Sequence, residues 1–215
     1  RQMCIRDRNI VDWCVVRGHR PPGTNPARWK GHLDQVLPAV RDVAPRGHHA
    51  ALAYAALPAF VAELRRQDEV AARALEFLIL TTARSGEVLG ATWDEIDFGA
   101  ATWTVPASRM KAKREHRVPL SPAALSLLRA LPREDGNPYC FVGPKAGQGL
   151  GGMMLARLLK RMGRDGITVH GFRSAFSDWA HESTSHANHG IELSLAHSVG
   201  SDVERAYRRG DMVLK

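Results

Sequence analysis

The chain has little of what a secreted or membrane protein needs. Its 215 residues include only three cysteines, Cys4, Cys14 and Cys140, which are widely spaced and form no CxxC pair. Such a set predicts neither a disulfide framework nor a zinc knuckle, and it is typical of a reducing, cytoplasmic compartment. The longest apolar run, residues 50–62, contains a proline and is well short of the roughly 20 residues that span a bilayer. We therefore expect no signal peptide and no membrane association.

Signatures of metal enzymes and of repeat proteins are also missing. The sequence contains no HExxH or comparable ligand frame, no internal repeat and no low-complexity tract. Five histidines, His170, His181, His186, His189 and His197, leave a metal-dependent hydrolase open as an alternative. A metal site requires a defined number and geometry of ligands, however, and histidines in loops are more often simply solvated. We expect neither a metal ion nor another cofactor.

Positive charge is the most prominent property of the composition. The net charge is +8 and the isoelectric point is near 9.9, which favours an anionic partner, most commonly nucleic acid. Residues 109–117, RMKAKREHR, carry five basic side chains against one glutamate. A solvated turn tolerates such a run as well. As a DNA surface, the run offers Arg109, Lys113, Arg114 and Arg117 as phosphate contacts.

Hydrophobic periodicity predicts a mainly helical α+β fold with one small three-stranded antiparallel sheet. Apolar residues at helical spacing mark several helices, whereas between residues 96 and 120 the apolar spacing drops to two, which is typical of strands. The basic run then connects the last two strands. The expected helices cover residues 57–64, 75–82, a segment with Ser121 as N-cap and Pro122 at its first position, 155–162, 172–179, and a last helix opened by a Ser201–Glu204 capping box.

The sequence before residue 48 is organised differently. Residues 1–8 show no clear period and are set aside as an artefact of the sequence edge. A short apolar helix candidate follows at residues 9–18, and then a loop rich in proline and glycine. We expect residues 1–47 to be the truncated end of one domain with its linker. Residues 48–215 are expected to form a second domain, truncated at its C-terminus.

An arginine emerges from an apolar helix in TTARSGEVLGATW, residues 81–93. Because a guanidinium keeps its charge, Arg84 needs either a carboxylate or an anionic ligand. Glu87, three residues further on, supplies the first alternative. An ion pair between these two residues and an anion-binding role for Arg84 both remain open at this point.

A second basic pair stands in VHGFRSAF, residues 169–176. His170 and Arg173 are three residues apart, so their side chains can project together from a helix. The aromatic residues Phe172, Phe176 and Trp179 are expected to hold the core face of the same helix. An isolated HxxR is frequent by chance, so the pair indicates a site only in combination with other motifs.

The segment LAHSVGSDVERAYRRG, residues 195–210, carries His197 and Tyr207. Tyr207 shares helical spacing with Val203 and Ala206, and a half-buried tyrosine with a solvated hydroxyl is common. A core role is therefore the alternative to a chemical role for Tyr207.

In chain order, Arg84, Lys111, His170 with Arg173, His197 and Tyr207 resemble the catalytic set of the tyrosine recombinases, the phage-type integrases, most closely those of satellite phages and genomic islands. The similarity runs from about residue 50 to residue 211. NPARWKGHLDQVLP, residues 25–38, is similar to the end of the core-binding domain that precedes the catalytic domain in this family. Residues 1–47 and 48–215 are accordingly expected to be the end of that domain and the catalytic domain.

This resemblance implies site-specific DNA cleavage and rejoining through a 3′-phosphotyrosyl intermediate, without a metal, during integration or excision of a mobile element. The implied roles are nucleophile for Tyr207, phosphate binding for Arg84, Arg173 and His197, general acid for Lys111, general base or phosphate contact for His170, and orientation of Arg84 for Glu87.

The implied partners are double-stranded attachment-site DNA, further copies of the chain in a tetramer on DNA, and accessory DNA-bending proteins in the nucleoid of a bacterial host. A type IB topoisomerase resembles the same site, and a DNA-binding remnant without activity is a further alternative. Two features depart from the family pattern: the histidine-rich stretch at residues 183–190, and a chain that stops eight residues after Tyr207.

Overall fold

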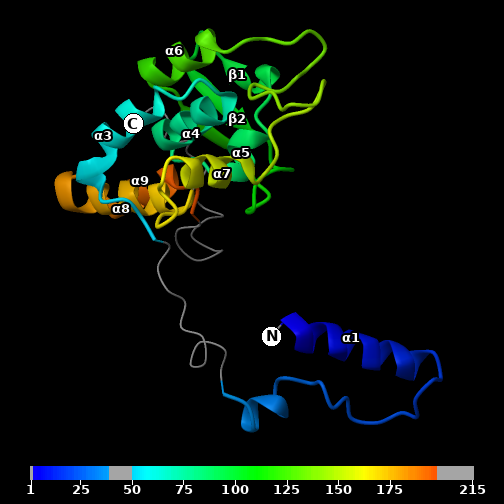
Figure 1. The fold of residues 1–215 in the computed structure, drawn as a ribbon. Coiled ribbons are helices and arrows are strands. Elements are labelled where there is room, and N and C mark those ends of the chain that lie inside the picture. The colour runs from blue at the N-terminus through cyan, green and yellow to red at the C-terminus, as the bar shows by residue number, and fades with distance from the viewer. Residues whose placement is uncertain (1, 39–49, 198–215) are drawn as a thin grey trace. The chain divides into compact units, whose positions relative to one another are not determined.

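The computed structural model describes residues 2–38 and 50–197 (Figure 1). They belong to two compact units, Arg1–His48 and His49–Lys215. In the first unit helix α1 spans Gln2–Val16, and a 3₁₀ turn, η1, spans Leu33–Gln35. Helix α1 thus begins within residues 1–8, where the sequence shows no helical period. Most of those residues are arginine, glutamine or methionine, which are good helix formers, and none is glycine or proline.

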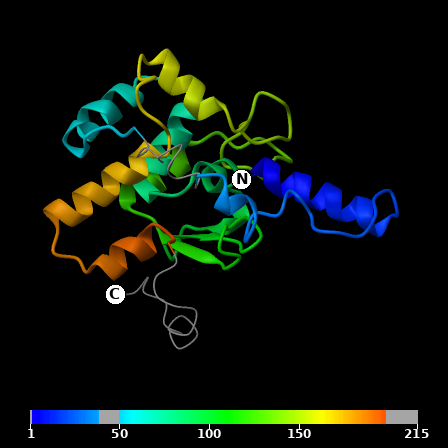
Figure 2. The same cartoon turned by 90° about the horizontal axis from the view of Figure 1, so that it is seen from below.

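The second unit is mainly helical with one three-stranded antiparallel sheet, which confirms the fold class expected from the sequence. Helix α4 lies at its centre and packs against α3, α5, α6 and α7 (Figures 1 and 2). Its elements are η2 (Tyr54–Ala56), α3 (Leu57–Leu64), α4 (Val70–Thr81), α5 (Ser85–Leu89), η3 (Trp93–Glu95), β1 (Ile96–Asp97), β2 (Thr102–Val105), β3 (His116–Pro119), α6 (Pro122–Ala130), α7 (Met154–Arg161), α8 (Gly171–Ser183) and α9 (Asn188–Ser194).

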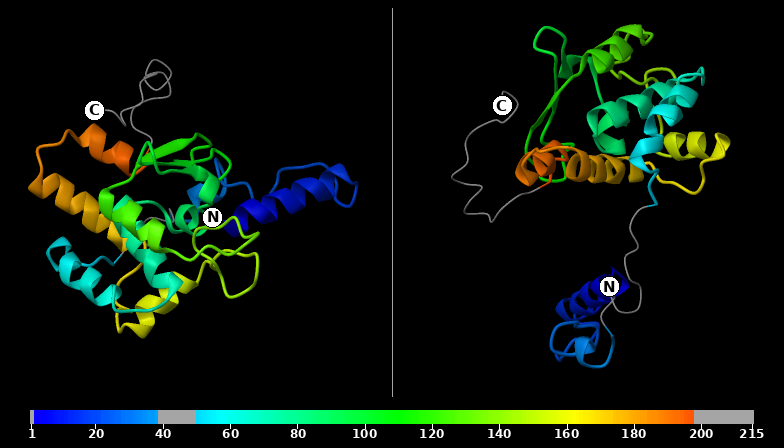
Figure 3. Two further views of the ribbon diagram at one scale, coloured as in Figure 1. Left: turned by 90° about the horizontal axis from the view of Figure 1, so that it is seen from above. Right: turned by 90° about the vertical axis from the view of Figure 1, so that its left-hand side faces the viewer.

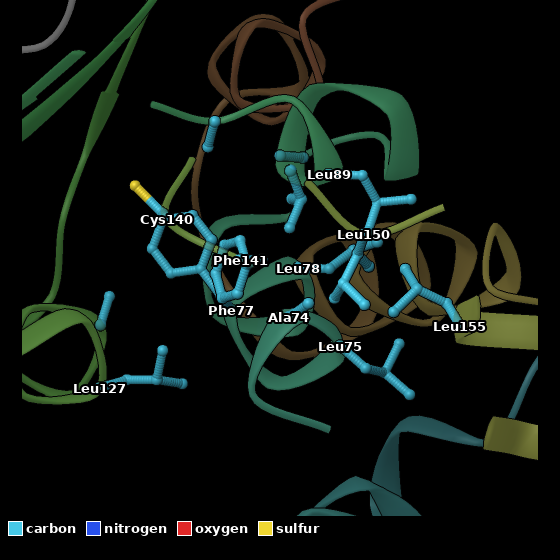
Figure 4. Close-up of a cluster of buried hydrophobic side chains, with 14 of the residues drawn as sticks. Ala74, Leu75, Phe77, Leu78, Leu89, Leu127, Cys140, Phe141, Leu150 and Leu155 are labelled. Carbon is cyan, nitrogen blue, oxygen red and sulfur yellow. The ribbon is translucent and has the colours of Figure 1, made fainter. Parts of the chain in front are cut away.

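The core is built around α4 because this helix is apolar on nearly every face. Leu75, Phe77 and Leu78 are fully buried, as expected for a helix that other elements surround. The ring of Phe77 lies 5.5 Å from that of Phe141 (Figure 4). It lies 5.3 Å from the ring of Trp103. Burial of each large apolar side chain stabilises the fold by about 1.5–3 kcal/mol. Helix α4 therefore holds in place the segment that follows its C-terminus, residues 82–84.

The sheet has the order β1-β2-β3. Trp103 in β2 stands opposite Ile96 in β1 and Val118 in β3, and all three side chains are buried. Residues directly opposite each other share one face of an antiparallel sheet, so the three form its core side. Strands β2 and β3 are joined by residues 106–115, which carry most of the basic run and are called the β2–β3 loop below.

The start of α6 agrees with the sequence-based prediction, whereas the end of α4 differs from it. Ser121 is the N-cap of α6, its Oγ accepting a hydrogen bond from the amide of Ala124 at 3.3 Å, and Pro122 is the first helical residue, as predicted. Thr82, predicted to belong to the apolar stripe of α4, instead ends that helix with a left-handed backbone, φ 52°. This turn directs the chain from α4 to Arg84 at the start of α5.

Helix α8 lies beside α9 (Figure 3) and corrects one prediction. Phe172 is buried as expected, but Trp179 is 42% exposed rather than part of the core. The two residues share one face of the helix, and Trp179 lies two turns further along. There it lines a surface groove with residues of α3, including Leu57 and Val61.

No helix in residues 2–38 or 50–197 combines the length and the apolar content that crossing a bilayer requires. The predicted capping box of Ser201 and Glu204 lies outside the described residues.

Candidate active site

A pocket of about 570 Å³ opens in the second unit where three stretches of chain meet. Of the described side chains that line it, five are cationic and one, that of Glu87, is a carboxylate. Such a concentration of positive charge in a hollow favours an anionic ligand. The lining residues come from α4 through α5 (Leu78 and Ala83, Arg84, Ser85, Gly86, Glu87), from the β2–β3 loop (Ser108, Arg109, Met110, Lys111, Lys113) and from the start of α8 (Val169, His170, Arg173).

Glu87 holds Arg84 at the N-terminus of α5. Its Oε1 accepts a hydrogen bond from Arg84 Nη1 at 2.9 Å, and its Oε2 accepts one from the Arg84 amide at 2.9 Å. Glu87 is almost fully buried, whereas a quarter of the Arg84 side chain is exposed. The ion pair that the sequence offered as one alternative is therefore present. It fixes the orientation of a guanidinium that also lines the pocket.

Arg173 is the most deeply buried cation of the pocket, with 4% of the residue exposed. Its Nη1 donates to the carbonyl of Thr82 and its Nη2 to the carbonyl of Leu195. Its Nε has no hydrogen-bond partner within the described residues. Burial first, and the nearby charge of Arg84 second, lower the pKa of Arg173 to about 10, with Glu87 acting in the opposite direction. The group stays charged at neutral pH, and an anion in the pocket would offset the cost of burying it.

The end of α9 connects the two arginines. The Arg84 Nη2 donates to the carbonyl of Ala196 at 3.2 Å, and Arg173 donates to the preceding carbonyl of Leu195. Carbonyls at a helix C-terminus lack intrahelical partners, so they are ready acceptors. This brings the backbone just before His197 to the pocket, while the His197 Nδ1 lies 2.8 Å from Glu192 Oε2. The sequence analysis did not predict the role of Glu192, although a carboxylate five residues before His197 could have indicated it. It also did not predict the roles of the Leu195 and Ala196 carbonyls, because a backbone carbonyl leaves no mark in the sequence.

The other predicted residues fall in three groups. Lys111 and His170 are exposed and line the pocket with Arg84 and Arg173, so the structure brings four of the six predicted catalytic positions together. His197 is exposed and bonded to Glu192 at the edge of this region. Tyr207 lies outside the described residues.

The predicted DNA contacts also differ among themselves. Lys113, Arg114 and Arg117 are exposed, and Lys113 lines the pocket. The Arg109 side chain is only 22% exposed and is bonded to the carboxylate of Glu95. A run of basic residues in the sequence does not show which side chain points inward, because all of them carry the same charge.

Among residues 2–38 and 50–197, no three His, Cys, Asp or Glu side chains gather closely enough to hold a metal ion. His181 instead lies between two acceptors, with Nδ1 2.7 Å from the carbonyl of Ser177 and Nε2 2.9 Å from Oδ1 of Asn188. The bond to Asn188 first, and that to Ser177 second, raise the pKa of His181. His181, just before the histidine-rich stretch, thus has a hydrogen-bonding role and binds Asn188 within that stretch.

The fold is that of a tyrosine recombinase catalytic domain. The chain is similar to lambda integrase in a tetramer bound to a Holliday junction, with a TM-score of 0.62 and 15% identity over 91% of this chain and 57% of that one. It is also similar to the Tn1549 transposon integrase in complex with circular intermediate DNA, with a TM-score of 0.60 and 14% identity over 95% and 73% of the two chains. At this level of identity the likeness shows a shared fold.

Sequence comparison then identifies the family. Residues 52–212 match the phage integrase family, and the chain belongs to it. All six predicted catalytic positions, Tyr207 included, fall inside this match.

Curated relatives support the same assignment. The chain is 40% identical to the prophage integrase IntA of Escherichia coli K12 over 62% of this chain and 33% of IntA. It is 36% identical to the prophage integrase IntZ of the same strain, over 77% and 41% of the two chains. Identity to the integrase of Enterobacteria phage P4 is 34%, over 74% and 41%. The chain therefore spans less than half the length of these relatives.

Proposed function

We propose that this chain carries the catalytic part of a site-specific recombinase that cleaves and rejoins DNA during integration or excision of a mobile element. The observation that carries the proposal is the pocket in which Arg84, Lys111, His170 and Arg173 meet. A DNA phosphodiester is a compact anion, and these side chains supply both the positive charge and the titratable groups that its cleavage needs.

The proposed reaction begins with Tyr207. Its hydroxyl oxygen forms a bond to phosphorus, the bond from phosphorus to the 5′-oxygen breaks, and the electron pair leaves with that oxygen. Lys111 donates the proton that the leaving 5′-oxygen needs, and His170 accepts the proton of the tyrosine. The product is a 3′-phosphotyrosyl link and a free 5′-hydroxyl. Attack by the 5′-hydroxyl of a partner strand reverses these steps and joins the new strands without ATP.

Stabilisation of the transition state is assigned to the two arginines and His197. Negative charge develops on the nonbridging phosphate oxygens, and guanidinium groups already held in place stabilise it without reorganising. Glu87 holds Arg84, and the carbonyls of Thr82 and Leu195 hold Arg173. These fixed cations can supply the charge that a metal ion provides in other phosphoryl-transfer enzymes, so we propose a metal-independent reaction.

The proposed partners follow from the same surface. Exposed Lys113, Arg114 and Arg117, with the outer edge of Arg109, are proposed to contact the phosphates of double-stranded attachment-site DNA. The lambda integrase tetramer on a Holliday junction supports a tetrameric assembly on DNA. We further propose that this assembly acts in a bacterial nucleoid together with accessory DNA-bending proteins.

A duplex with a nick beside the cleavage position tests the proposal, because loss of the short strand traps the covalent product. In excess EDTA we expect a protein–DNA adduct that survives denaturing gels. Arg84→Ala should slow adduct formation by 10²-fold or more, since removing one transition-state donor typically costs about 10²–10³. Arg129→Ala removes an equal charge from α6, outside the pocket, and should leave the rate unchanged.

Dependence of the adduct on added Mg²⁺ would contradict the metal-independent reaction. Relaxation of supercoiled DNA with no strand exchange between two duplexes would instead favour a type IB topoisomerase. Binding without any adduct is the behaviour of a DNA-binding remnant.

A further inference from the structure

Arg109 has contacts unlike those of the exposed basic residues that follow it in the β2–β3 loop. Its Nη1 donates to the backbone carbonyl of Glu87 at 3.1 Å, and its Nη2 donates to the carboxylate of Glu95. The side chain is 22% exposed, whereas Lys111 and Lys113 are exposed residues. Most of Arg109 therefore points into the protein, between α5 and the sheet.

Glu95 is itself a fixed anchor for Arg109. The Oε2 of Glu95 accepts a hydrogen bond from the indole Nε1 of Trp103 at 3.0 Å and a second from the amide of Thr92 at 3.4 Å. Trp103 is fully buried beside Phe77 in the core. An ion pair with a partner held in this way loses little further side-chain freedom, in contrast to an exposed pair.

Gly90, just after α5, provides the space that Arg109 occupies. A Cβ at Gly90 would lie 2.6 Å from Arg109 Nη1 and 3.3 Å from its Cδ. The φ of Gly90 is −97°, which any residue can adopt, so the close approach of Arg109 is what requires glycine here. A Cβ at position 90 therefore requires the Arg109 guanidinium to shift from the place where it bonds to the Glu87 carbonyl and the Glu95 carboxylate.

The arrangement joins two parts of the pocket through one residue. The side chain of Glu87 holds Arg84, and its backbone carbonyl holds Arg109. Met110 follows Arg109 and is buried, and Lys111 comes next. The first part of the β2–β3 loop is thus hydrogen-bonded, through Arg109, to Glu87, which also orients Arg84.

We propose that Arg109, Glu95 and Gly90 form a clasp that positions Lys111 for proton donation. Arg109 is a positioning residue in this proposal, in addition to any contact it makes with DNA, and the proposal rests on the proposed function of Lys111. Because a misplacement of about 1 Å can cost about 10²-fold in rate, release of the clasp should impair the step that Lys111 serves and leave phosphate binding by Arg84 and Arg173 intact.

Two variants release the clasp in different ways. Arg109→Met keeps the aliphatic stem and removes the guanidinium, and Gly90→Ala displaces the guanidinium without changing any charge. Arg129→Met, on α6, is the control for loss of one positive charge outside the pocket. All are compared in single-turnover cleavage of a strand with the natural 5′-bridging oxygen and of one with 5′-bridging sulfur, which leaves without a proton.

We expect both clasp variants to cleave the oxygen strand about 10–10²-fold more slowly than the wild type, and the sulfur strand within about threefold of it. The Arg129→Met chain should match the wild type on both. Equal slowing of Arg109→Met and Gly90→Ala on the two strands would overturn the proposal, because it would place the defect in folding or phosphate binding. Unchanged cleavage of the oxygen strand would overturn it as well.

Amide hydrogen exchange over residues 106–115 tests the clasp without any catalysis. In the DNA-free chain, both clasp variants should exchange faster there than the wild type and Arg129→Met, with unchanged exchange in α4 showing that the core is intact. Unaltered exchange over residues 106–115 would overturn the clasp whatever the cleavage rates. A wild-type chain that cleaves neither strand would contradict the proposed function, and the exchange measurement would still decide the clasp.

Discussion

At the scale of single residues, Arg84 and Arg173, two of the arginines that line the pocket, are held mainly by different groups. Arg84 is partly exposed and is oriented by the carboxylate of Glu87. Arg173 is buried and is held by two backbone carbonyls, and its pKa is lowered to about 10 chiefly by that burial. The Arg84 guanidinium is therefore oriented chiefly by a side chain that mutation can remove, whereas Arg173 is held by backbone carbonyls.

The roles of Lys111 and Arg84 can be separated through the leaving group. If Lys111 protonates the departing 5′-oxygen, Lys111→Ala should be slow on the natural strand and restored by about 10²–10⁴-fold on a 5′-bridging sulfur strand. Arg84→Ala should remain slow on both, because charge on the nonbridging oxygens develops whichever atom departs. Single-turnover cleavage rates measure both effects. Equal defects of Lys111→Ala on the two strands would make it part of the basic surface, with Lys113 as the next candidate acid.

Cys140 should be protected from alkylation in the folded chain. Burial, with the charge of Glu95 second, raises the pKa of its thiol to about 12, so at pH 8 very little thiolate is present. We expect iodoacetamide to modify Cys140 at least about 10²-fold more slowly in the native than in the unfolded chain, as measured by peptide mass spectrometry. Since the unfolded thiol ionises first, stability from this site is lost as pH rises from the ordinary thiol pKa toward 12. Rapid native modification would contradict the buried position.

The residues of the site were predictable to the extent that side-chain type reveals them. Arg84, Lys111, His170 and Arg173 were predicted because their order along the chain resembles the catalytic set of the tyrosine recombinases, and the structure gathers them in one pocket. The carbonyls that hold Arg173 could not be predicted, because every residue has one. The inward position of Arg109 depends on Glu95 and Gly90, which come from another segment of the chain and look unremarkable in the sequence.

At the scale of elements, helices and strands were predictable wherever one local pattern decides them. The apolar spacing of two between residues 96 and 120 predicted the strands that hold Ile96, Trp103 and Val118, and Ser121 begins α6 as its side chain suggests. Trp179 was misplaced because the periodicity of a helix shows which face is apolar and not how far along that face the core extends. Burial at a helix end depends on neighbouring elements that the helix itself does not encode.

The start of α8, which carries His170 and Arg173, depends on a close backbone contact at Gly171. A Cβ there would lie 2.4 Å from the carbonyl oxygen of Ala50 and 2.9 Å from Cα of Ala51. Gly171→Ala must therefore push α8 away from this segment, and we expect a loss of about 1–3 kcal/mol, or roughly 2–10 °C in Tm. Thermal unfolding of Gly171→Ala beside Gly166→Ala measures this. A Cβ at Gly166 meets nothing within 4 Å, so equal melting of the two variants would refute the contact.

At the scale of the whole molecule, net charge and its placement decide how the chain meets DNA. Negative residues predominate at 51–100, while the β2–β3 loop gathers positive charge beside the pocket. Phosphate contacts fix position and carry no sequence information. Because the exposed basic residues of the β2–β3 loop are suited to phosphate contacts, we expect this loop to bind duplex DNA with weak sequence preference.

Binding to duplex DNA should fall steeply with salt, because each neutralised phosphate releases counterions. Replacing Lys113 or Arg114 by alanine should reduce the slope of log K against log salt by about 1 each, and Arg129→Ala should not change it. Fluorescence anisotropy at several salt concentrations gives these slopes. A slope near zero for the wild type, or equal slopes for all variants, would count against the β2–β3 loop as the DNA surface.

The central claim is that Tyr207 becomes covalently joined to DNA, and the most direct measurement is identification of the residue that carries the trapped strand. On a nicked duplex the wild-type chain should give an adduct stable to denaturation, and mass spectrometry should locate the phosphate on the peptide that contains Tyr207. Tyr207→Phe removes the attacking oxygen with little change in volume, so it should bind DNA with unchanged affinity and form no adduct. An adduct that persists in Tyr207→Phe, or that maps to another residue, would contradict the account.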